Sequence, residues 1–236
     1  MPPDLDLPKI AAIALIFSAW ALYGPILGLI GRGTLNLQLH AVRRSWMHML
    51  ISTARDHRTF DALMMGHIMN SISFFGSATL LVLAGLVGSL ANVNDLYGVV
   101  RELKFVGTMS VELFTLYLTV VTTALGVSFF SFVYALRKLA YTLAMIGGLG
   151  EAPGDDPQSQ IMVAETATVL TEAVKSLNNG IRGYYFAVSA LFLFIGPYAC
   201  MLMTLVMASI LYSRQAFSRT AKAIAIYVDA IKKRDG

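Results

Sequence analysis

The sequence predicts an all-α membrane fold, and three observations carry that prediction. The 236 residues are 56% hydrophobic and only 14% charged, whereas soluble domains carry about 25% charged residues. The charges leave four long gaps along the chain, and each gap suffices for the roughly 20 apolar residues that cross a bilayer. A single cysteine, Cys200, excludes an intramolecular disulfide framework.

The uncharged gaps predict four transmembrane helices in one membrane domain, residues 1–213. Their expected bounds are about 10–31, 63–91, 108–136 and 183–212. Two acidic residues precede Lys9 where a cleaved signal peptide needs basic ones, so the first gap is expected to be a lasting anchor. Pro25 and Pro197 are expected to kink the first and fourth spans. No gap is long enough for two spans with a turn.

The connections between these spans predict amphipathic helices at about 35–60 and 158–181. In the first, apolar residues recur at helical spacing and Arg43 and Arg44 lie on the other side. The second has the 4,3,4,3,4 spacing of a helix that packs against another helix. Its apolar positions are Val163, Ala167, Leu170, Val174, Leu177 and Ile181. The tail, 214–236, holds six of the 18 basic residues and predicts a basic helix at the membrane surface.

Charge does not decide the membrane orientation of the four spans. Both termini then lie on one side, and the basic residues divide nine to nine between the two sides. Giving the first span more weight favours a cytoplasmic position for the two long connections, because Lys9 beside two aspartates opposes Arg32, Arg43 and Arg44. Giving the last span more weight favours the reverse.

Blocks of residues in matching order, over about 170 residues, resemble a known family. They include 44–47, 55–58, 131–137 and, most specifically, 178–186. The family they resemble is a bacterial and plant membrane family catalogued as domain of unknown function 599. The resemblance implies four helices and no particular reaction. The chain departs from the family at Gln215, where an acidic residue is usual, and at Gly76, where alanine is usual.

A polar stripe in the third span is the first candidate for function. Glu112, Thr115, Thr119 and Thr122 follow a 3,4,3 spacing and therefore share one helix face. Intramembrane acids often mark ion or proton paths, so the stripe is a putative pathway. The alternative is that Glu112 lies near the interface and that the stripe is a hydrogen-bonded helix contact.

A basic, glycine-rich helix entry before the fourth span is the second candidate. Arg182 follows Asn178 and Asn179 by one helical turn, and Tyr184 supplies an aromatic ring at headgroup level. Such an arginine can bind a lipid headgroup or another anion. The alternative is an anchor whose donors are satisfied by neighbouring carbonyls.

Soft metal ligands form a weaker candidate. Met64, His67 and Met69 lie within two helical turns, and copper(I) favours thioether and imidazole ligands. Methionine is also an ordinary filler of apolar helices. We therefore expect no metal and no cofactor.

The sequence contains no catalytic triad, phosphate loop or paired carboxylate set, so we expect no enzyme activity. The expected function is a homo-oligomeric scaffold or accessory protein of the bacterial inner membrane, with lipid and further copies of itself as partners and no nucleic acid. The alternative is a homo-oligomeric channel or small-solute transporter that uses the stripe of Glu112.

Overall fold

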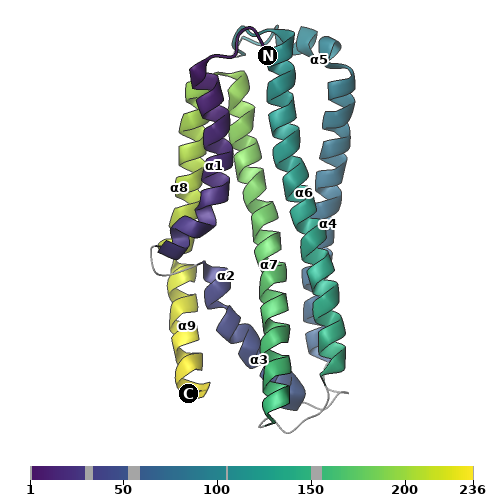
Figure 1. Ribbon diagram of the computed structural model, residues 1–236, viewed down its shortest axis with the longest axis vertical. Helices are drawn as coiled ribbons and strands as arrows, with labels where there is room; N and C mark the ends of the chain where they lie inside the picture. Colours follow the sequence, from purple (N-terminus) through teal and green to yellow (C-terminus); the bar gives the residue numbers. More distant parts are fainter. Residues whose placement is uncertain (1, 30–33, 53–58, 105, 150–155, 236) are drawn as a thin grey trace. The chain divides into compact units, whose positions relative to one another are not determined.

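The computed structural model describes residues 2–29, 34–52, 59–104, 106–149 and 156–235, and throughout these ranges it contains helices and no strands. The helices follow one another along the chain as Figure 1 shows. They are α1 (Leu7–Leu29), α2 (Leu35–Gln38), α3 (His40–Ser52), α4 (Thr59–Ala91), α5 (Val93–Val100), α6 (Val111–Gly148), α7 (Pro157–Leu191), the 3₁₀ turn η2 (Phe192–Phe194), α8 (Pro197–Ala216) and α9 (Arg219–Asp235).

Four stretches of helix in the described residues are long and apolar enough to cross a membrane. They are Leu7–Gly28, Thr59–Ala91, Val111–Gly148 and Pro197–Lys233. The all-α class is thus confirmed, and the first three stretches overlap the first three predicted spans. Each of the three overlaps a run of 20 or more uncharged residues, enough to cross a bilayer. The helix α6 continues past the predicted end at 136, through Arg137 and Lys138, to Gly148.

The fourth predicted span, 183–212, is wrong as a single helix. The helix α7 ends at Leu191, the turn η2 follows, and α8 begins at Pro197. Proline has no N–H to donate and disfavours helical backbone at the preceding residue, Gly196, whose φ is 159°. Pro197 therefore starts a new helix instead of kinking a continuing one.

The two predicted amphipathic helices are also divided differently. The second does not end near 181, because α7 runs on without a break from Pro157 to Leu191. The range predicted for the first, 35–60, holds α2, α3 and the start of α4, and its residues 53–58 lie outside the described residues. Thr34 has extended backbone and caps α2, because its side-chain oxygen accepts the Leu37 N–H at 3.3 Å.

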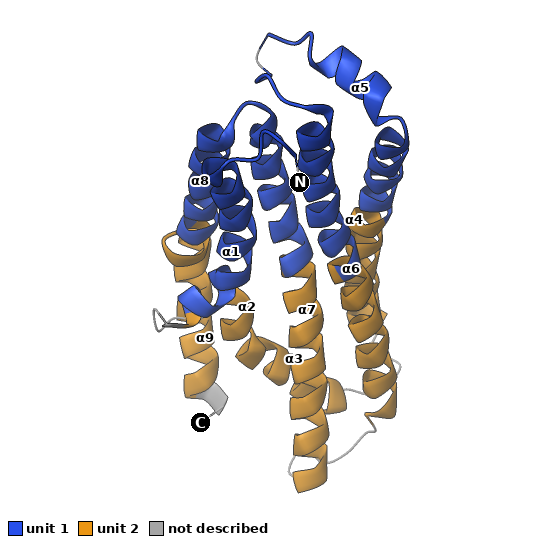
Figure 2. Cartoon of the chain, turned by 45° about the horizontal axis from the view of Figure 1, so that its top comes forward, with its two compact units in different colours: residues 1–27, 77–130, 179–213 blue, residues 28–76, 131–178, 214–236 orange. Residues whose placement is uncertain are grey.

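The chain separates into two compact units, coloured in Figure 2. Unit 1 comprises residues 1–27, 77–130 and 179–213, and unit 2 comprises 28–76, 131–178 and 214–236. The helices α4, α6 and α7 contribute a segment to each unit.

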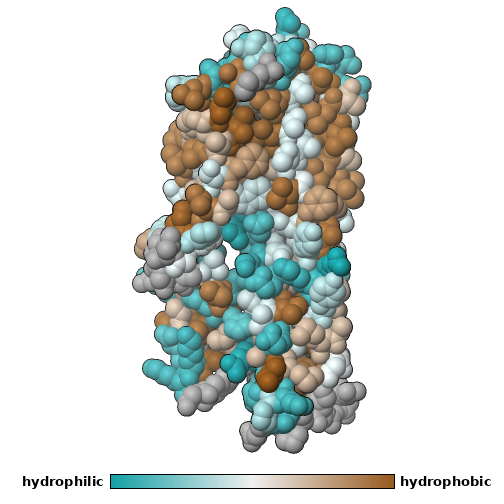
Figure 3. All heavy atoms as spheres, in the orientation of Figure 1, coloured by the Kyte–Doolittle hydropathy of each residue, from teal (hydrophilic) through white to brown (hydrophobic). Residues whose placement is uncertain are grey.

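Unit 1 has an apolar core formed by α1, α6, α7 and α8. Ile16, Tyr117, Phe186 and Leu193 are at most 1% exposed within it. The surface of this unit that Figure 3 shows is also largely hydrophobic, as expected for helices that face lipid.

Unit 2 combines α2, α3 and α9 with the remaining segments of α4, α6 and α7. The tail helix α9 packs on α2 and α3, and its buried residues Ala221, Val228 and Ile231 recur at helical spacing. The spacing of 158–181 has the same explanation within this unit, because Val163, Ala167 and Leu170 are buried. These positions are already covered by the chain itself, so this part of the seam is not open to a partner helix.

Candidate functional site

Arg182 lies between two other helices of unit 1. Its guanidinium carbon is 5.0 Å from the centre of the Tyr23 ring on α1, which is cation–π geometry. The hydroxyl of Tyr23 is buried and donates to the carbonyl oxygen of Leu211 on α8 at 2.9 Å. A ring on α1 thus connects a cation on α7 to the backbone of α8.

Asn179, one turn before Arg182, has an equally specific contact. Its side-chain oxygen accepts the indole N–H of Trp20 at 3.2 Å. The indole stacks on Phe186, with the ring centres 6.1 Å apart and an interplanar angle of 22°. Trp20 therefore holds α1 against two turns of α7 at once.

Gly183 allows this close packing. A Cβ atom built at Gly183 would lie 2.8 and 2.9 Å from ring carbons of Trp20 and would overlap the hydroxyl of Ser128 on α6. Real Cβ atoms do not approach other atoms so closely, so the position requires glycine. The next residue, Tyr184, forms a hydrogen bond through its hydroxyl to Thr79 on α4.

Of the four residues predicted for an anion or lipid headgroup, three thus contact other helices: Asn179, Arg182 and Tyr184. Asn178 is half-buried next to them. Trp20 and Tyr23 were missed, although their i, i+3 spacing near the end of an apolar span is a signal for interfacial aromatic residues. These contacts hold α1, α4, α6, α7 and α8 together within unit 1.

The polar stripe of α6 lies on the outer side of unit 1. Glu112 and Thr119 are exposed, and Thr115 and Thr122 are half-buried. Each threonine hydroxyl donates to the carbonyl four residues earlier in its own helix at 2.8 Å. Glu112 occupies the first turn of α6, where the helix dipole favours a carboxylate.

The three metal candidates all lie on α4. Met64 and His67 are exposed on α4, and Met69 is half-buried. Among the described residues, no group of three or more His, Cys, Asp or Glu side chains could hold a metal ion.

A buried polar cluster in unit 2 was not predicted. Thr171 on α7 donates its hydroxyl proton to the carbonyl of Ala167 at 2.8 Å. The same oxygen accepts from Arg43 at 3.2 Å and lies 3.1 Å from Nδ1 of His40. Since the hydroxyl proton is already used, the His40 Nδ1–H must be the donor in that contact.

Arg43 also donates to the carbonyl of Asn36 at 3.0 Å, and the amide of Asn36 donates to the carbonyl of Thr171 at 3.1 Å. Burial lowers the pKa of Arg43 to about 10, which leaves it charged at neutral pH. The side-chain oxygen of Asn36 is buried without a hydrogen-bond partner. The cluster attaches α2 and α3 to α7, and its long sequence separations explain why periodicity did not reveal it.

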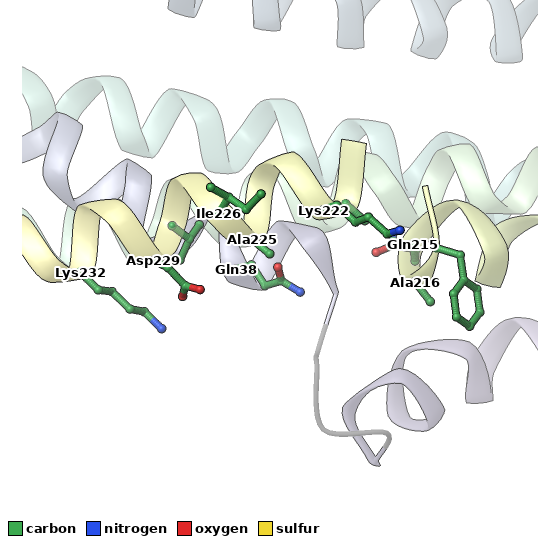
Figure 4. Close-up of a pocket in the computed structure, with 11 residues that line it drawn as sticks. Gln38, Gln215, Ala216, Lys222, Ala225, Ile226, Asp229 and Lys232 are labelled. Atoms are coloured by element: carbon green, nitrogen blue, oxygen red, sulfur yellow. The ribbon is translucent and has the colours of Figure 1, made fainter. Parts of the chain in front are cut away.

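A groove of about 600 Å³ runs along α9. Figure 4 shows Gln215 and Lys222 at one end and Asp229 and Lys232 at the other. Gln215, the departure from the family pattern, accepts the Leu35 N–H at 2.9 Å through its side-chain oxygen and so satisfies the first N–H of α2.

The long apolar helices define the class: the fold is all-helical and suits a multi-pass membrane protein. The family described as Protein of unknown function, DUF599 matches residues 11–220. The chain therefore belongs to this family, as its sequence blocks had suggested. No curated protein and no solved structure matches the chain.

Proposed function

We propose that the protein is a homo-oligomeric scaffold or accessory protein of the bacterial inner membrane, without catalytic activity of its own. The observation that supports this most is the close packing of side chains in the core of unit 1. Its core positions hold large apolar or aromatic side chains such as Phe114, Tyr117 and Phe186, each at most 2% exposed. At these positions the interior of a single copy of unit 1 is filled by apolar packing.

Homo-oligomer formation is supported by small residues on the outside of α4. Gly85 and Gly88 are exposed, and a Cβ atom added at either would meet nothing within 4 Å. Small residues one turn apart on a lipid-facing helix allow a second helix to approach closely. The substitution Gly88→Leu is expected to shift the detergent-solubilised protein toward one chain per particle, and Val87→Leu, also on the outer surface, is the matched control.

The second candidate is a channel or small-solute transporter formed between subunits. It is favoured by the outward position of Glu112 and Thr119, because an exposed polar stripe can line a pathway only if other copies enclose it. The same outward position is explained if the stripes of two subunits form hydrogen-bonded helix contacts within a scaffold.

Ion flux into liposomes separates the two functions. The purified protein is reconstituted, and potassium and chloride flux are recorded under both polarities of potential. The scaffold predicts flux equal to that of protein-free liposomes. Flux that Glu112→Gln abolishes, with Glu165→Gln on the exposed face of α7 as the control, would establish the channel instead.

A further inference from the structure

Unit 1 has two distinguishable ends. At the first end, each connection leads from one helix of unit 1 to another helix of unit 1. We call it the loop end: residues 4–9, 97–104, 106–110 and 192–196. Ser110 donates its N–H to Asp4 at 2.7 Å, and Gly107 donates its N–H to the carbonyl of Phe194 at 3.0 Å. These bonds bring the start of α1, the connection from α5 to α6 and the turn between α7 and α8 together.

The opposite end is where the chain passes between unit 1 and unit 2, five times, at residues 27, 77, 130, 179 and 213. We call it the junction end. Each passage lies within seven residues of a contact described above. These contacts are Trp20 with Asn179, Tyr23 with Leu211, Thr79 with Tyr184, and Gly183 with Ser128 and Trp20.

Five helix segments thus connect the two ends, one each from α1, α4, α6, α7 and α8. The contacts of Tyr23 are decisive, because they join Arg182, nine residues before the end of α7, to Leu211, fourteen residues after the start of α8. Both helices therefore pass beside the same part of α1, which requires α7 and α8 to form an antiparallel hairpin.

This hairpin changes the charge count. Along the sequence, only Lys9, Arg101 and Lys104 belong to the loop end. The other 15 of the 18 basic residues are Arg182, at the junction end, and those of unit 2, whose three segments are all attached covalently to that end. The nine-to-nine division of a four-span chain becomes three against fifteen.

We propose that the chain crosses the membrane five times, with its N-terminus outside the cell and unit 2, including α9, in the cytoplasm. Basic residues in short connections and next to spans are retained on the cytoplasmic side. The five acidic residues of unit 1 (Asp4, Asp6, Asp95, Glu102 and Glu112) all lie at or beside the loop end, which gives that end a net negative charge.

The crossing by α7 is the one that hydropathy misses. From Ser176 to Leu191 it has 16 residues, about 24 Å of helix, and Arg182 interrupts them. An arginine in this position is costly in lipid. Its guanidinium lies on the Tyr23 ring, between helices of unit 1 rather than toward lipid. The topology goes beyond the proposed function and holds equally for a scaffold or a channel.

Cysteine labelling in intact spheroplasts tests the topology. Cys200 is replaced by serine, and one cysteine is placed at a time at Glu102, Lys175 or Ala223, all of which are exposed. A membrane-impermeant maleimide is added before or after lysis. The expected result is labelling of Glu102→Cys in intact spheroplasts, and of Lys175→Cys and Ala223→Cys only after lysis.

Two results would overturn the proposal. With four crossings, Glu102→Cys and Ala223→Cys would react under the same conditions, because both would lie on one side. With five crossings in the reverse orientation, Ala223→Cys would react in intact spheroplasts and Glu102→Cys would not. A fluorescent protein fused after Gly236 gives an independent measurement for any variant that fails to insert, and the proposal expects it to be cytoplasmic.

Discussion

Gly183→Ala should destabilise unit 1 because the added methyl group has no space. It would lie 2.8 and 2.9 Å from carbons of Trp20 and would overlap the Ser128 hydroxyl. Trp20 is held in place by its stacking on Phe186 and its hydrogen bond, so it cannot move freely. Overpacking of this kind costs about 1–3 kcal/mol, which corresponds to a Tm lower by about 2–12 °C in a chain of this size.

The chain's only cysteine supplies the assay. Cys200 is fully buried in the core of unit 1, so a dye that fluoresces on reaction with a thiol reports when that core opens on heating. Gly126→Ala is the control, because a Cβ atom there meets nothing within 4 Å. Adding Ser128→Ala to Gly183→Ala should recover only part of the loss, since Trp20 remains. A Gly183→Ala protein that melts at or above the wild-type temperature would refute the packing argument.

Three further substitutions test other parts of the structure. Thr171→Val removes the hydroxyl oxygen that accepts from both Arg43 and His40 in unit 2, and it should cost about 1–3 kcal/mol in the free energy of unfolding. The exposed Thr168→Val, which loses only a bond within its own helix, should change it by less than about 0.5 kcal/mol; equal losses would contradict the assigned contact. Gln215→Ala should lower stability by about 0.5–1.5 kcal/mol through loss of the hydrogen bond from the Leu35 N–H, and no loss in chemical denaturation would contradict it. Glu112→Gln should leave the thiol-dye Tm within about 2 °C of wild type, because the side chain is exposed, and a larger drop would show that Glu112 is buried in the folded protein.

Sequence alone predicted the helices well where charge marks their limits. The stretches that overlap α1, α4 and α6 follow from uncharged gaps, because ionised side chains are excluded from hydrocarbon. The same reasoning failed between Gly183 and Ser213, since an absence of charge says nothing about where the backbone turns. Pro197 was identified there as an interruption, but a proline can kink a helix or begin a new one, and only its packing partners decide between the two.

The sequence indicated several residues of the candidate site but not the residues that they contact. Arg182, Asn179 and Tyr184 were selected from the sequence, yet Trp20 lies 159 positions from Asn179 and Arg43 lies 128 from Thr171. Helical periodicity relates residues three or four apart, so it cannot reveal such pairs. The residues of the Glu112 stripe all lie in α6, but the exposure of Glu112 and Thr119 depends on how α6 packs.

The hairpin of α7 and α8 is the central claim, and a distance between two spin labels tests it most directly. With Cys200 replaced by serine, labels are attached at Val188→Cys on α7 and Ile210→Cys on α8, both exposed positions. A single continuous helix would separate them by about 33 Å, at 1.5 Å per residue. Antiparallel neighbours whose axes lie about 10 Å apart would bring the two backbones to about 18 Å. The structure predicts the shorter distance, and a distribution centred near 33 Å would contradict both the hairpin and the five-crossing topology.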